Sequence, residues 1–209
     1  MLRIDKYIER LRRTRDKGAQ MRHARLRLPW SQFCALIPYM TKDTIEGLKT
    51  IEAPAKFRGH DVPRDLQMAD FDTLIRLQGC GGKGEWFWSC MAIVETLTGA
   101  KQEAVATAPA EDVLGIVNMV EREMERIGRL FQSLQGGTSG DEVAAGIDRL
   151  DFGAFGIVDW YARRMGIVDH EEVFALPWQR IFQCMKIDHE NNEFEKRYRK
   201  IIEQRSKTK

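Results

Sequence analysis

Apolar residues recur at intervals of three and four between Val113 and Leu134, over about six helical turns. This spacing predicts a long amphipathic helix whose apolar face packs against a core. The residues before it favour a helix start, because Pro109 suits the beginning of a helix and the carboxylates of Glu111 and Asp112 suit its positive end. We expect this helix to be the longest in the protein.

The same periodicity continues along most of the chain, and no segment shows the two-residue alternation typical of a half-buried strand. Further helices are expected after Leu28-Pro29-Trp30, after the N-caps Thr41 and Asp70, over 86–97, over 157–165, and after Leu176-Pro177-Trp178. The predicted fold class is therefore all-α: a multi-helix bundle with a C-terminal helical subdomain.

The Leu-Pro-Trp sequence occurs twice, at 28–30 and at 176–178, and each copy precedes an apolar helix. A duplicated unit would need self-similarity over about 20 residues or more, and the match does not extend that far. We interpret the two copies as the same helix-start chemistry used twice.

Glycine marks the strongest predicted boundary, since three of the five residues 136–140 are glycines. We accordingly divide the chain into a basic N-terminal helix or arm (1–27), a helical core domain (28–135), a linker (136–140), and a C-terminal helical subdomain with a basic tail (141–209).

Charge is distributed unevenly along the chain. Residues 1–27 carry a net charge of +7 and residues 186–209 carry +3, so the middle carries −8 within a total of +2. Two interpretations remain open. Both ends are solvated helices with surplus Lys and Arg, or they contact an anionic surface or a second copy of the chain.

Composition narrows the class of protein. The 209 residues contain no apolar run near the ~18 residues of a membrane span, and the first residues lack an apolar secretion segment, so we expect a cytosolic protein. Cys34, Cys80, Cys90 and Cys184 are widely spaced without a CxxC pair, and we expect them to be reduced.

The search for catalytic motifs favours a non-enzymatic protein. Lys83 lies in a Gly-Gly-Lys-Gly stretch, but Leu77 and Gly84 replace the glycine and the Ser or Thr that a phosphate-binding loop requires. His189 begins a zinc-protease-like sequence in which Glu193 replaces the second histidine. We predict no catalytic residue, no metal site, no cofactor and no small-molecule substrate.

Three consecutive aromatic residues, Trp86, Phe87 and Trp88, are the most unusual local feature. Neighbouring residues of a helix point about 100° apart, so the three rings cannot share one core face. One interpretation is that a ring wraps the edge of the bundle. The other is that an exposed ring anchors a protein partner, and on this basis we treat the triplet as a candidate interaction site.

The N-terminal segment supplies the second candidate site, Arg10, Arg12, Arg13 and Arg15. A nucleic-acid-binding regulator would use such a basic cluster. However, few aromatic residues lie among these arginines and no helix-turn-helix can be placed, so nucleic acid is possible but not favoured.

Four segments follow one another over roughly residues 60–202: residues 70–78, the helix 109–134, residues 152–160, and the ending from Leu176-Pro177-Trp178 through 194–198. Their pattern and order resemble those of the tail-assembly chaperones of tailed phages and prophages. The basic segment 1–27 and the loop 81–84 lie outside this resemblance.

The resemblance implies a protein that binds rather than catalyses. Such proteins escort the tape-measure protein while tail-tube subunits polymerise around it. The expected partners are phage tail or other virion proteins, together with self-association, in the host cytoplasm. The alternative is a structural connector or tail-completion protein that remains in the virion.

Overall fold

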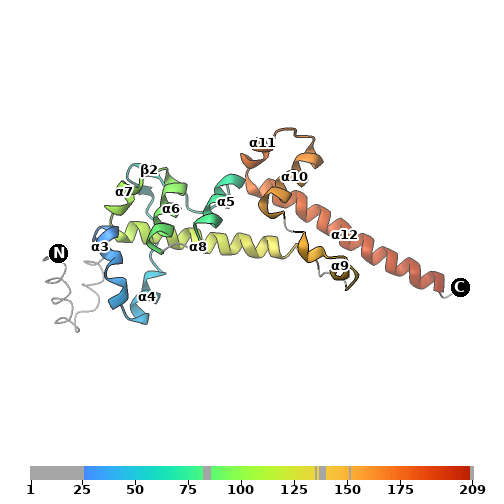
Figure 1. The fold of residues 1–209 in the computed structure, drawn as a ribbon, viewed down its shortest axis with the longest axis horizontal. Coiled ribbons are helices and arrows are strands. Elements are labelled where there is room, and N and C mark those ends of the chain that lie inside the picture. The colour runs from blue at the N-terminus through green and yellow to red at the C-terminus, as the bar shows by residue number, and fades with distance from the viewer. Residues whose placement is uncertain (1–25, 82–85, 135, 137–139, 151, 208–209) are drawn as a thin grey trace. The chain divides into compact units, whose positions relative to one another are not determined.

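The computed structural model describes residues 26–81, 86–134, 136, 140–150 and 152–207, and this part of the chain is mostly helical (Figure 1). Its α-helices are α3 (Trp30–Cys34), α4 (Lys42–Leu48), α5 (Phe71–Cys80), α6 (Trp86–Thr98), α7 (Gln102–Ala106), α8 (Ala110–Gln132), α9 (Gly140–Ala144), α10 (Gly153–Met165), α11 (His170–Phe174) and α12 (Trp178–Lys207). Two 3-10 helices, η1 (Ile37–Tyr39) and η2 (Ile147–Arg149), and two short strands, β1 (Lys56–Phe57) and β2 (His60–Asp61), complete the described elements. The predicted all-α class is confirmed.

The helices group into two compact units. The described residues of 26–64 and 86–119 form unit 1, and those of 65–81 and 120–207 form unit 2. Helix α8 contributes to both units, because unit 1 takes it up to Met119 and unit 2 takes the remainder. This division does not follow the boundaries predicted at 135 and 141, and those boundaries stay a prediction.

Several helices begin at the caps that the sequence predicts. The side chain of Thr41 accepts a hydrogen bond from the amide of Thr44 at 3.3 Å, and Asp70 accepts one from the amide of Thr73 at 2.6 Å. Asp169 caps α11 in a similar way. Each side chain thus satisfies one of the amide groups that a helix leaves unpaired at its start.

The hairpin of β1 and β2 was not predicted. Its strands pair antiparallel with Phe57 opposite His60, and the two turn residues, Arg58 and Gly59, have φ values of 50° and 90°. Two positive φ angles define the type I′ turn, in which Asn or Asp usually precedes the glycine. Here Arg58 precedes it, so the sequence does not indicate a hairpin.

The core of unit 1 gathers apolar side chains from α3, from the hairpin, and from α6 through the first half of α8. Its buried apolar residues are Trp30, Phe33, Leu36, Phe57, Val62, Cys90, Met91, Ile93, Val94, Ala100, Val105, Ala108, Ala110, Val113, Leu114, Ile116, Val117 and Met119. The segment after α4 lies close against α8, because Asn118 Nδ2 donates to the backbone oxygens of Leu48 (2.7 Å) and Ile51 (3.1 Å).

The core of unit 2 draws on α5, the second half of α8, and α10 to α12. The buried apolar residues of this unit are Leu66, Phe71, Leu74, Leu77, Val120, Ile127, Val158, Tyr161, Ala162, Val173, Trp178, Ile181 and Phe182.

In unit 1 the first Leu-Pro-Trp sequence pairs with the start of α8. The amide of Trp30 donates to the oxygen of Ala108 at 2.8 Å, and the amide of Ala110 donates to the oxygen of Leu28, also at 2.8 Å. These two bonds form an isolated antiparallel bridge between Pro29 and Pro109. These hydrogen bonds connect the beginnings of α3 and α8, which lie 80 residues apart in the sequence.

Unit 2 contains the same arrangement. The amide of Phe71 donates to the oxygen of Leu176 at 2.9 Å, and the amide of Trp178 donates to the oxygen of Ala69 at 3.2 Å. Here the bridge joins Asp70 to Pro177. The two Leu-Pro-Trp sequences therefore lie at non-equivalent positions of the two bridges. In unit 1 the sequence precedes the short helix, α3, whereas in unit 2 it precedes the long helix, α12.

The first two of the three helices that end each motif also match in length. In unit 1, α6 has 13 residues and is followed by Gly99 (φ 71°), the five-residue α7, and α8. In unit 2, α10 has 13 residues and is followed by Gly166 (φ 68°), the five-residue α11, and α12. Val105 and Val173 are both fully buried, four residues before the proline that precedes the long helix. Each unit thus contains one copy of the same helical motif.

One prediction about helix length is wrong. Among the described residues the longest helix is α12, with 30 residues, and not α8, with 23. The buried residues of α12 are Trp178, Ile181 and Phe182, all near its start. The remainder of α12 has no buried face, so the spacing of its apolar residues does not indicate how far the helix extends.

Candidate interaction surfaces

The aromatic triplet at the start of α6 packs around Trp30 in unit 1. The ring of Trp30 is buried, with ring centroids at 5.9 Å from Phe33, 5.2 Å from Trp86 and 6.3 Å from Phe87. Phe87 in turn meets Trp88 edge-on at 5.0 Å. The triplet therefore packs against the buried aromatic cluster of Trp30 and Phe33.

Two of the three rings remain partly accessible to solvent. Trp86 is 44% exposed and Trp88 is 53% exposed, whereas Phe87 is half-buried. The helical geometry thus distributes the triplet as expected, with Trp88 farthest from the core. The role of these residues in binding stays a prediction.

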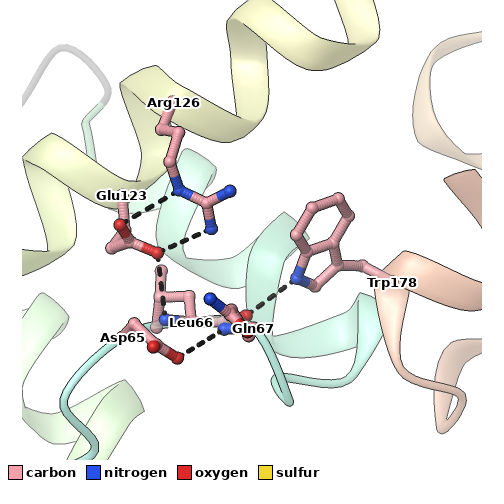
Figure 2. Close-up of polar contacts among 6 residues, drawn as sticks. All are labelled: Asp65, Leu66, Gln67, Glu123, Arg126 and Trp178. Atoms are coloured by element: carbon pink, nitrogen blue, oxygen red, sulfur yellow. Dashed lines mark hydrogen bonds and ion pairs between the residues drawn. The ribbon is translucent and has the colours of Figure 1, made fainter.

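A polar cluster in unit 2, absent from the sequence-based predictions, joins the connector before α5 to two long helices (Figure 2). Glu123 of α8 accepts two hydrogen bonds from Arg126, at 3.1 and 2.8 Å, and one from the amide of Leu66 at 3.3 Å. The oxygen of Leu66 accepts a hydrogen bond from Nε1 of Trp178 at 2.7 Å. Asp65 accepts one from the amide of Gln67 at 3.0 Å.

The geometry of this cluster has electrostatic consequences. The hydrogen bonds from Arg126 lower the pKa of Glu123 below its usual value, because they favour the ionised carboxylate. The guanidinium of Arg126 also lies 6.0 Å from the ring centre of Trp178. All these groups hold backbone and helices together, and we assign the cluster a structural role.

A second polar group in unit 2 connects α10 with α11 and α12. Arg164 forms an ion pair with Asp188 and lies 5.6 Å from the ring centre of Trp160. His170 lies 3.6 Å from Asp159 and packs against Phe155, with ring centroids 5.0 Å apart. His170 is the first residue of α11, directly after the N-cap Asp169.

Arg10, Arg12, Arg13 and Arg15 lie outside the described residues. In the described part of the chain, no group of three or more His, Cys, Asp or Glu residues is placed to hold a metal ion. None of the described helices has the length and apolar character needed to cross a membrane.

The outer part of α12 is a surface that the sequence analysis did not single out. Beyond Phe182, five apolar side chains are at least 45% exposed: Ile187, Phe194, Tyr198, Ile201 and Ile202. Phe194 and Tyr198 stack on one another with ring centroids 6.1 Å apart. Their helical spacing was visible in the sequence, but it did not reveal that these residues lie outside the core.

Comparison with known proteins adds no relative, since no protein-family model, curated protein or solved structure matches this chain.

Proposed function

We propose that this protein is a non-enzymatic assembly protein of a tailed phage or prophage, and that it acts as a tail-assembly chaperone in the host cytoplasm. Its client would be a helical protein such as the tape-measure protein. The phage assignment rests on the order of sequence segments over residues 60–202, and the binding role rests on the surface of unit 1.

The observation that carries the binding role is the exposure of Trp86 and Trp88 on an otherwise buried aromatic cluster. Tryptophan is the residue type most enriched at binding hot spots. Here Trp30 packs against Trp86 and Phe87 packs against Trp88. The two exposed side chains are therefore already restrained and lose little conformational freedom when a partner binds. A helix with apolar residues at three- and four-residue intervals would fit such a surface.

The experiment is capture of partners by the full-length protein from phage-infected or induced cells, followed by binding measurements with the captured tail protein. We expect Trp88→Ala to weaken client binding by about 1–3 kcal/mol, which is the usual range for an interface hot spot. Tyr39→Ala is the matched control, because Tyr39 is a 68% exposed aromatic residue of the same unit outside the triplet.

Equal affinities for the two variants would contradict the proposed surface. Mass spectrometry of purified particles separates the two assembly roles, since a chaperone is absent from finished particles and a connector is present. Binding to duplex DNA with a steep salt dependence, and to no virion protein, would instead identify a nucleic-acid-binding regulator.

A further inference from the structure

The outer part of α12 combines an exposed apolar stripe with a long regular helix. Ile187, Asn191, Phe194, Tyr198 and Ile201 are separated by four, three, four and three residues in turn. This alternation places them on one side of the helix and is the spacing of a coiled-coil seam. Residues 187–207 extend for about 30 Å at the helical rise per residue.

The internal repeat compares the first residue of this stripe with its counterpart in unit 1. When the sequence is aligned on the two prolines that precede the long helices, Ile187 of α12 corresponds to Met119 of α8. Met119 is 1% exposed, whereas Ile187 is 50% exposed. Near Met119, Asn118 binds the segment after α4, while its counterpart Lys186 is exposed. At this position the motif is therefore covered in unit 1 and open in unit 2.

Charge along the open part of α12 changes sign at a single point. Residues 188–195 contain four Asp or Glu and no Lys or Arg, whereas residues 196–207 contain six Lys or Arg and one Glu. The boundary falls between Glu195 and Lys196, within the apolar stripe. Two such helices side by side in parallel would place like charges together, whereas an antiparallel pair would place each acidic block against a basic block.

We propose that the outer part of α12, residues 187–207, pairs antiparallel with the same segment of a second copy of this protein. The interface is self-complementary, as a two-fold symmetric dimer requires, because one helix supplies both the acidic and the basic block. Phe194, Tyr198 and Ile201 form its apolar centre. This interface is built from other residues than the Trp86 and Trp88 surface and does not rest on the proposed function.

The apolar contribution is tested by the oligomeric state of the full-length protein in sedimentation equilibrium. We expect a dimer for the wild type, and at least a tenfold increase of its dissociation constant for Phe194→Ser combined with Ile201→Ser. Val168→Ser is the matched control, because Val168 is a 96% exposed apolar residue outside α12 and should leave the dimer unchanged. Circular dichroism verifies that all variants remain folded.

Charge reversal tests the antiparallel direction. Glu190→Lys, Glu193→Lys and Glu195→Lys together change the net charge of residues 188–195 from −4 to +2, so both blocks become basic. Lys196→Glu, Arg197→Glu, Arg199→Glu and Lys200→Glu together change that of residues 196–207 from +5 to −3, so both blocks become acidic. Each of these two variants should be monomeric, and the variant with all seven substitutions restores blocks of opposite charge in one chain and should recover the dimer. Lys101→Glu with Glu103→Lys, on exposed residues of unit 1, controls for charge changes elsewhere.

Each negative outcome overturns the proposal. A wild-type protein that stays monomeric at every concentration contradicts self-pairing, as does a dimer that is insensitive to the Phe194 and Ile201 variants. A sevenfold variant that remains monomeric contradicts the antiparallel arrangement. Failure of client binding by Trp88→Ala, with the dimer intact, bears on the proposed function alone.

Discussion

Nε1 of Trp178 donates a hydrogen bond to the backbone oxygen of Leu66, 112 residues earlier in the chain, at 2.7 Å. The indole of Trp30, at the corresponding tryptophan of the other Leu-Pro-Trp sequence, is also buried, but its Nε1 has no hydrogen-bond partner among the described residues. Two buried tryptophans in the same sequence context thus differ in whether the ring nitrogen is satisfied.

This difference predicts unequal costs for replacing either tryptophan by phenylalanine. Both substitutions remove buried ring atoms, but Trp178→Phe also removes the ring hydrogen bond to the Leu66 oxygen, which then keeps only the amide of Ala69, at 3.2 Å, as a donor. Losing one such hydrogen bond costs about 0.5–1.5 kcal/mol. Trp30→Phe removes a donor that pairs with nothing in the described chain. We expect Trp178→Phe to lower the free energy of unfolding more, as measured by urea denaturation. Equal losses would show that the hydrogen bond to Leu66 contributes nothing net.

Glu123 predicts how the stability of unit 2 depends on pH. Its pKa is lower in the folded protein, chiefly because Arg126 hydrogen-bonds to the carboxylate, so it contributes stability above its unfolded pKa and loses that contribution as the pH falls through the folded pKa. Glu123→Gln should cost about 1–3 kcal/mol at pH 7 and less at pH 3, which lies below the ordinary pKa of a glutamate. Urea denaturation at both pH values measures this, and a loss that is independent of pH would contradict it.

Cys34 should be a slow nucleophile in the folded protein. Burial raises the pKa of its thiol to about 12, from an ordinary value of 9.0. Because the thiolate is the reactive form, its population near pH 8 falls by roughly a thousandfold relative to the unfolded chain. Alkylation with iodoacetamide, located by mass spectrometry, should therefore be far slower at Cys34 in the native protein than in urea. Similar rates in both states would show that the thiol is not shielded.

What the sequence predicts well is local. The caps at Thr41, Asp70 and Asp169 satisfy amides only two or three residues away, so residue type and position suffice to place them. The face of α8 is likewise recorded in the spacing of its own apolar residues. The partial exposure of Trp86 and Trp88 follows from helix geometry alone.

What the sequence does not predict depends on distant pairing. The bridges of Pro29 with Pro109 and of Asp70 with Pro177 join segments 80 and 107 residues apart, and the bonds are between backbone groups that every residue type carries. The repeat was not recognised from the sequence for the same reason. Its two copies share helix lengths and buried positions, whereas the two identical Leu-Pro-Trp sequences lie at non-equivalent positions in the motif. The open face of α12 was missed because periodicity marks an apolar stripe without stating what covers it.

The two glycines within α8 provide the last prediction. A Cβ at Gly115 would lie 2.1 Å from the backbone oxygen of Glu52, whereas a Cβ at Gly128 would have no atom within 4 Å. Alanine is favoured over glycine in a helix interior by roughly 0.5–1 kcal/mol, so Gly128→Ala should stabilise the protein by about that amount. Gly115→Ala should instead destabilise it by about 1–3 kcal/mol or more, because the backbone of the segment after α4 must move away and the hydrogen bonds of Asn118 to that segment are strained. Thermal unfolding of the two variants beside the wild type measures both effects in one helix. Stabilisation by both would show that the segment around Glu52 does not lie against α8, and destabilisation by both would show that Gly128 is also closely packed.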